Sequence, residues 1–110
     1  MKSEITEIIE AIRKFRDERD WQQFHDKKNL AICLNIESSE LLENFLWKNA
    51  EDANPEKIRN ELADVFYNAF LLADTYGFDV KEIVLNKLKA NGLKYPIDKS
   101  KGSNKKYDEL

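Results

Sequence analysis

The feature that most constrains the fold is the helical spacing of the apolar residues along almost the whole chain. Apolar side chains recur every three or four residues in four segments, so that each segment would carry one apolar stripe. These segments begin near residues 3, 28, 54 and 79, and the first two run to about residues 19 and 48. No segment shows the alternation of a strand. The sequence therefore predicts an all-α fold, a four-helix bundle.

The ends of the later helices are marked by residues with known end preferences. Asn54 followed by Pro55 is typical of a helix start, and Gly77 fits the left-handed conformation that closes a helix. Asp79 and Glu82 have the spacing of a capping box and predict the start of the fourth helix.

With 110 residues the chain has the length of one domain. We predict that residues 1–96 form a single all-α domain. After Tyr95-Pro96 the sequence becomes polar and contains Gly, Ser and several lysines, so residues 97–110 are expected to be a flexible basic tail unless a ligand orders them.

Two pairs of acids interrupt the apolar stripes of the second and third helices. Glu37 and Glu40 are three residues apart on one helix, and Glu61 and Asp64 repeat that spacing on the next. Positions three apart lie on nearly the same helical face, so each pair would flank a core stripe. If the two helices pack antiparallel, the four carboxylates can converge, and Asn68 follows Asp64 by one turn on the same flank.

Converging carboxylates repel one another, and desolvation raises their pKa values, unless a cation binds them. All-oxygen ligands favour Mg²⁺, or Mn²⁺ in its place, and such ions often accompany phosphate substrates. A di-iron site would need Glu-x-x-His on two helices, whereas His25 is the only histidine and lies outside the stripes. The remaining alternative is that the acids lie at a wet edge of the bundle and pair with lysines from elsewhere.

Basic and aromatic residues offer further candidate contacts, each with a structural alternative. Lys87 and Asn91 lie on the apolar side of the fourth helix, where the lysine could neutralise a phosphate or extend its amine to solvent. Trp21 and Trp47 could pack in the core or stack on a flat base. Because a helix to residue 48 would place Trp47 on the Glu40 side, we favour a base pocket beside the acids.

The overall composition limits the partners and the compartment. The net charge of −3 argues against binding of a nucleic acid polymer. No apolar run has the length of a membrane span, and the N-terminal residues lack the apolar region of a signal peptide. Cys33 is the only cysteine, which fits a reducing compartment, so a cytoplasmic location is expected.

Taken together and in order, these motifs resemble the MazG-like nucleotide pyrophosphohydrolases, in particular the compact single-domain branch that includes the dCTP pyrophosphatases. The resemblance covers about residues 4 to 108 and rests on the following segments: Trp21-Gln-Gln-Phe-His25, Lys28-Asn29-Leu-Ala31, Glu37-Ser-Ser-Glu40 through Trp47, Glu61-Leu-Ala-Asp64, Lys87 through Pro96, and Lys101-Gly-Ser103.

The resemblance implies an all-α pyrophosphatase fold and hydrolysis of a nucleoside triphosphate to monophosphate and pyrophosphate. It assigns Mg²⁺ to the four acids, the phosphate side to Lys87, Asn91, Lys94 and Tyr95, and the nucleotide pocket to Trp21, His25, Asn29 and Trp47. It also implies a homodimer or homotetramer whose sites are completed across a subunit interface.

Two positions depart from the pattern of the eukaryotic dCTP pyrophosphatases, which have His where this chain has Ile12 and Tyr where it has Asn68. Both positions bear on the choice of base or sugar. The expected function is therefore nucleotide clean-up by a Mg²⁺-dependent pyrophosphohydrolase with a pyrimidine or modified-base preference. The alternative is a non-catalytic helical module that senses nucleotides or metals or binds another protein.

Overall fold

The computed structural model describes residues 1–110 and contains helices and turns with no strand. The longer helices are α1 (Glu4–Glu18), α2 (Lys27–Glu43), α3 (Pro55–Thr75) and α4 (Val80–Lys94), and α5 (Ile97–Ser100) is a single turn. Short 3-10 turns cover Gln22–Phe24, Ala50–Asp52 and Tyr107–Glu109. The all-α fold class predicted from the sequence is confirmed.

Each long helix begins where a side chain can accept a hydrogen bond from a free backbone amide. Ser3 accepts from Thr6, and Asp26 accepts from Asn29. Asn54 accepts from Glu56 ahead of α3, and Pro55 occupies the first turn as predicted. Gly77 has a φ of 74°, the left-handed conformation expected after α3.

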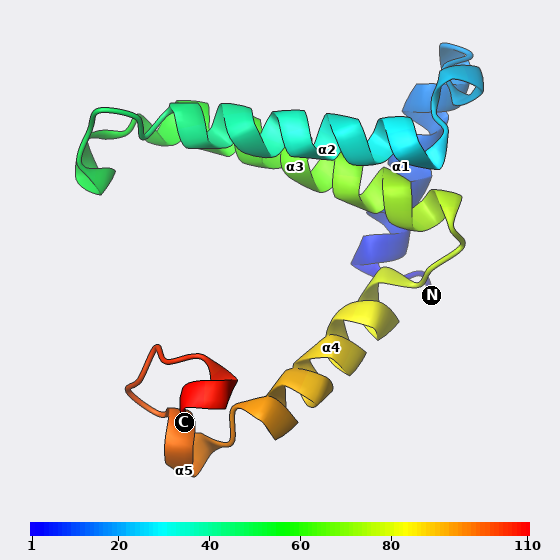
Figure 1. The fold of residues 1–110 in the computed structure, drawn as a ribbon. Coiled ribbons are helices and arrows are strands. Elements are labelled where there is room, and N and C mark those ends of the chain that lie inside the picture. The colour runs from blue at the N-terminus through cyan, green and yellow to red at the C-terminus, as the bar shows by residue number, and fades with distance from the viewer. The chain divides into compact units, whose positions relative to one another are not determined.

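The chain forms two compact units, Met1–Phe78 and Asp79–Leu110. In the first, α2 and α3 lie antiparallel and side by side, and α1 packs on α3 (Figure 1). Leu30 of α2 and Leu71 of α3 are almost completely buried there. Few other apolar side chains are buried, so this small core leaves much apolar surface exposed.

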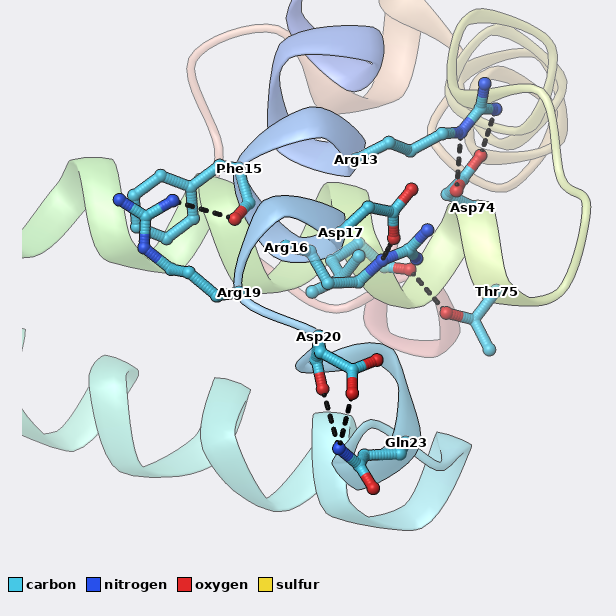
Figure 2. Close-up of polar contacts among 10 residues, drawn as sticks. Arg13, Phe15, Arg16, Asp17, Arg19, Asp20, Gln23, Asp74 and Thr75 are labelled. Carbon is cyan, nitrogen blue, oxygen red and sulfur yellow. Dashed lines mark hydrogen bonds and ion pairs between the residues drawn. The ribbon is translucent and has the colours of Figure 1, made fainter.

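An ion pair fastens α1 to the C-terminal half of α3. Nε and Nη2 of Arg13 both donate to the carboxylate of Asp74, and the distance from Nε to Oδ2 is 2.9 Å (Figure 2). Arg16, which is buried, donates from Nε to Asp17 at 2.8 Å. The Arg13–Asp74 ion pair thus joins α1 to the C-terminal half of α3, whereas the predicted acids Glu61 and Asp64 lie in the other half of that helix.

The second predicted helix is shorter than expected. It ends at Glu43 rather than near residue 48, and turns follow it up to Lys48. Asn44 explains part of this difference, because its side-chain amide donates to the carbonyl oxygen of Glu40 at 3.0 Å and offers the backbone an alternative to further helix. Trp47 then adopts a φ of 62°, which ends any helical continuation.

The second unit contains α4 and the segment predicted to be a flexible tail. Asp79 accepts a hydrogen bond from the amide of Glu82, as the capping box predicted. The tail includes α5 and the last 3-10 turn, and Tyr107 packs edge-on against Tyr95 with ring centroids 6.2 Å apart. The expectation of a flexible tail is therefore not confirmed. No helix of the structure is both long and apolar enough to cross a membrane.

Candidate functional site

The antiparallel pairing of α2 and α3 brings acids from both helices together. Carboxylate oxygens of Glu37, Glu61 and Asp64 all lie within 4.8 Å of one another. Glu40 is one helical turn from Glu37 and faces a groove that Glu61 also lines. We refer to Glu37, Glu40, Glu61 and Asp64 as the acid cluster.

The cluster perturbs the ionisation of its own members. The pKa of Glu37 is raised from 4.5 to about 7, first by desolvation on burial and then by the neighbouring Glu40 carboxyl. The pKa of Glu61 is also raised, first by desolvation and then by the charges of Glu40 and Asp64. Mutual repulsion of this kind indicates that the carboxylates lack a compensating cation within the chain.

The lack of hydrogen-bond partners at two carboxylate oxygens supports the same conclusion. Oε2 of Glu37 and Oε2 of Glu61 are each buried, and neither has a hydrogen-bond partner. Buried oxygens without a partner are costly, and they are uncommon outside functional sites. Both residues belong to the group whose carboxylate oxygens lie within 4.8 Å of one another, so a shared cation could compensate these carboxylates.

An apolar groove adjoins the cluster between α1 and α3. It has a volume of about 480 Å³, which is within the range of small-molecule sites. Asp64 is its one acidic lining residue, and Trp21 contributes an aromatic wall. The other lining residues are Ile8, Ala11, Ile12, Phe15 and Tyr67. We call it the apolar groove.

A second groove adjoins the other side of the cluster and is mostly polar. It has a volume of about 600 Å³ and lies between α2, the connection that follows α2, and the start of α3. Its lining residues are Glu40, Glu43, Asn44, Lys48, Lys57 and Glu61. We call it the polar groove. The acid cluster therefore separates an apolar groove from a polar one.

The aromatic and polar residues predicted around the nucleotide pocket lie in different surroundings. Trp21 lines the apolar groove. The ring of His25 stands edge-on to the ring of Trp21, with the two ring centroids 6.5 Å apart. Asn29 is exposed, and its amide donates to Asp26 at 3.2 Å. Trp47 is fully exposed, with a relative exposure of 100%. Because α2 ends at Glu43, the inference that a continuous helix carries Trp47 to the Glu40 side is wrong.

Asn68 is buried on α3, one helical turn after Asp64 of the cluster. Its side-chain amide donates to the carbonyl oxygen of Asp64 at 2.9 Å, one turn earlier on α3. The predicted contact of Asn68 with substrate stays a prediction.

Lys87, Asn91, Lys94 and Tyr95 all belong to the second unit, whereas the acids belong to the first. Lys87 lies on α4 beside Ile83, Val84 and Leu88, where a shallow apolar pocket opens. The backbone carbonyl of Asn91 accepts from Tyr95 at 2.8 Å, and Lys94 Nζ lies 4.9 Å from the ring centroid of Tyr107. Their predicted role on the phosphate side stays a prediction.

Several residues at the site were not predicted from the sequence. Glu43 adds a carboxylate whose charge raises the pKa of Glu61. Its three-residue spacing from Glu40 could have indicated from the sequence that it lies near the acid cluster. Lys57 precedes Glu61 by four residues and lies on the same helical face, so its place near the acids could have been predicted from the sequence. Phe15 and Tyr67 line the apolar groove, and only the pairing of α1 with α3 reveals this.

Comparisons by sequence and by structure relate the chain to the MazG-like family and to pyrophosphatases. The family model described as MazG-like matches residues 32–110. The chain is 36% identical to dCTP pyrophosphatase 1 of Bos taurus, over 93% of this chain and 68% of that protein, and 35% identical to the Homo sapiens protein of the same name, over 93% and 67%. A crystal structure of a pyrophosphatase from Archaeoglobus fulgidus superposes with a TM-score of 0.81 at 33% identity, covering 87% of this chain and 95% of the other.

Proposed function

The chain belongs to the MazG-like family, and on that premise we propose that it hydrolyses a nucleoside or deoxynucleoside triphosphate to the monophosphate and pyrophosphate. It would thus be a nucleoside triphosphate pyrophosphohydrolase, the enzyme class of its curated relatives. The reaction would depend on Mg²⁺, with Mn²⁺ as a substitute, and would clear unwanted nucleotides.

The observation that carries the proposal is the acid cluster. Mg²⁺ prefers carboxylate oxygens, and three of the four acids already bring such oxygens within 4.8 Å of one another. Two of the carboxylates also present a buried oxygen without a partner. The donor set and the geometry therefore fit a hard divalent cation, and Glu37, Glu40, Glu61 and Asp64 would hold it.

When bound, Mg²⁺ supplies charge neutralisation for the polyphosphate and lowers the pKa of its water toward neutrality. The protein contributes the arrangement around that centre. Glu37 and Glu61 must lose their protons to bind a cation, and their raised pKa values make this pH-dependent near neutrality for Glu37. By family motif, Lys87, Asn91, Lys94 and Tyr95 would contact phosphate oxygens.

The apolar groove is the proposed site of the base. Trp21 offers a ring for stacking, and Asp64 connects the groove to the acid cluster. The position that holds His in the eukaryotic dCTP pyrophosphatases is Ile12 here, which makes this wall of the groove apolar. We propose a preference for pyrimidines, including ones with an added methyl group, which would gain about 0.8 kcal/mol from burial of that carbon. His25, Asn29, Trp47 and Asn68 remain the other proposed substrate contacts.

The exposed apolar surface supports a homodimer or homotetramer. A second apolar groove of about 500 Å³ runs along α1 and α3, and its lining includes Phe66, which is 52% exposed. The core of this unit is small, so a second copy of the chain would bury surface that the monomer leaves in water. We propose that the active sites are completed across this subunit interface.

Amide variants at the acid cluster test the function. Glu40→Gln and Asp64→Asn should abolish release of pyrophosphate from a panel of triphosphates with Mg²⁺, while the helical circular dichroism survives. Glu51→Gln is the matched control, because Glu51 is exposed and outside the cluster. Near-normal turnover by both cluster variants would refute the proposal, whereas nucleotide binding without any turnover by the wild type would favour a sensor.

A further inference from the structure

The polar groove contains two lysines that the proposed function does not use. Lys48 follows α2 on the connecting segment, and Lys57 lies in the first turn of α3. Both line the groove together with the carboxylates of Glu40 and Glu61. Neither ammonium group forms an ion pair or a side-chain hydrogen bond, although acids lie in the same groove.

The order of residues along α3 shows how the grooves relate to the acid cluster. Lys57, Glu61 and Asp64 occur at intervals of four and three residues, so they form one row on the helix. Lys57 and Glu61 line the polar groove, and Asp64 lines the apolar groove together with Tyr67. From residue 57 to residue 67 the row extends about 15 Å at the helical rise, comparable to an extended nucleoside triphosphate.

The charge of the polar groove depends on the cation. Three carboxylates and two lysines give the groove a net charge of −1, which would repel a polyphosphate. A divalent cation on Glu40 and Glu61 would change the sign of this charge. The groove would then attract phosphate oxygens, and the two free ammonium groups could approach them without breaking existing contacts.

We infer that Lys48 and Lys57 hold the terminal phosphates of the substrate, and the pyrophosphate product, in the polar groove. The inference rests on the proposed function and adds the direction in which the nucleotide lies. The base occupies the apolar groove, the α-phosphate lies at the acid cluster, and the β- and γ-phosphates extend toward the start of α3. Cleavage between the α- and β-phosphates then leaves the monophosphate and the pyrophosphate on opposite sides of the cluster.

The test measures binding of inorganic pyrophosphate and of a nucleoside monophosphate by calorimetry with Mg²⁺ present. The variants are Lys48→Gln, Lys57→Gln and the double variant. Lys14→Gln on α1 serves as the control, because it removes the same charge from a side chain that is 78% exposed and outside both grooves. All three substituted positions are exposed, and helical circular dichroism verifies folding.

The double variant should bind pyrophosphate about tenfold more weakly, as expected for two solvent-exposed charge contacts, with monophosphate binding and the control unchanged. Unchanged pyrophosphate affinity in the double variant would overturn the inference. Equal losses for pyrophosphate and monophosphate would also overturn it, because they indicate a general charge effect. If the wild type cleaves no triphosphate but the lysines still bind pyrophosphate, the proposed function fails and the groove assignment stands.

Discussion

Replacing Glu37 by glutamine should stabilise the cation-free protein at alkaline pH while removing its activity. The Glu37 carboxyl is the member of the acid cluster with the largest pKa change, from 4.5 to about 7, caused by burial and by Glu40. Above pH 7 the folded protein must carry this charge beside other carboxylates. Glutamine has the same shape without the charge, so the substitution removes the repulsion.

The magnitude follows from the pKa change. A shift from 4.5 to about 7 corresponds to about 3.4 kcal/mol at 1.36 kcal/mol per pKa unit. Because water reaches the site through the adjoining grooves, we reduce this by about threefold, to about 1 kcal/mol. For a chain of this length, 1 kcal/mol raises Tm by about 4 °C.

The pH dependence has a defined sign. A folded-state pKa above the unfolded value means that the folded protein holds the Glu37 proton between pH 4.5 and about 7, where the unfolded chain releases it. The wild type therefore loses stability as the pH rises through this window, and the glutamine variant does not. The advantage of the variant should be full at pH 8 and about a quarter as large at pH 5.

Thermal unfolding followed by circular dichroism at pH 5 and pH 8, with a chelator present, measures this difference. Glu51→Gln is the control, since it removes an exposed carboxylate outside the cluster. A variant that is less stable than the wild type at pH 8, or one whose advantage is the same at both pH values, would refute the reasoning.

Three further predictions concern the cation, the apolar groove and the packing of α1. Adding Mg²⁺ at about 100 times its Kd should stabilise the wild type by about 2.7 kcal/mol in thermal unfolding at pH 8, and Asp64→Asn should lose most of that gain. Trp21→Ala should raise KM about tenfold with a smaller effect on kcat, and Trp21→Phe should recover most of the loss, as steady-state kinetics would show. Asp74→Asn should destabilise by about 1 kcal/mol at pH 7, measured by urea unfolding. Because Arg13 lowers the pKa of Asp74, this difference should diminish as the pH falls below 3.8; a constant difference would contradict the ion-pair explanation.

The helices were predictable because their signals are local. Ser3, Asp26, Asn54 and Asp79 each accept a hydrogen bond from an amide two or three residues later, and such spacings are visible in the sequence. The end of α2 was missed because the Asn44 side chain competes for a carbonyl oxygen within an otherwise helical pattern. The contact of Tyr107 with Tyr95 was not predicted, because it joins the tail to the end of α4 and depends on how the tail folds back.

The acid cluster was partly predictable for the same reason. Each acid pair is a local feature of one helix, and the short connection between the helices implied antiparallel packing. The grooves on either side were not predictable, because they depend on tertiary pairing. Phe15 lines the apolar groove only because α1 packs on α3, and the polar groove brings Lys48, on the connection after α2, beside Lys57 and Glu61 of α3.

The central claim is cleavage between the α- and β-phosphates of a nucleoside triphosphate. Phosphorus-31 NMR of the wild-type protein, incubated with Mg²⁺ and each of the common and 5-methylated triphosphates, measures this directly. We predict monophosphate and pyrophosphate in equal amounts, with no signal from diphosphate or inorganic phosphate. Diphosphate with inorganic phosphate, or no product from any triphosphate, would contradict the account.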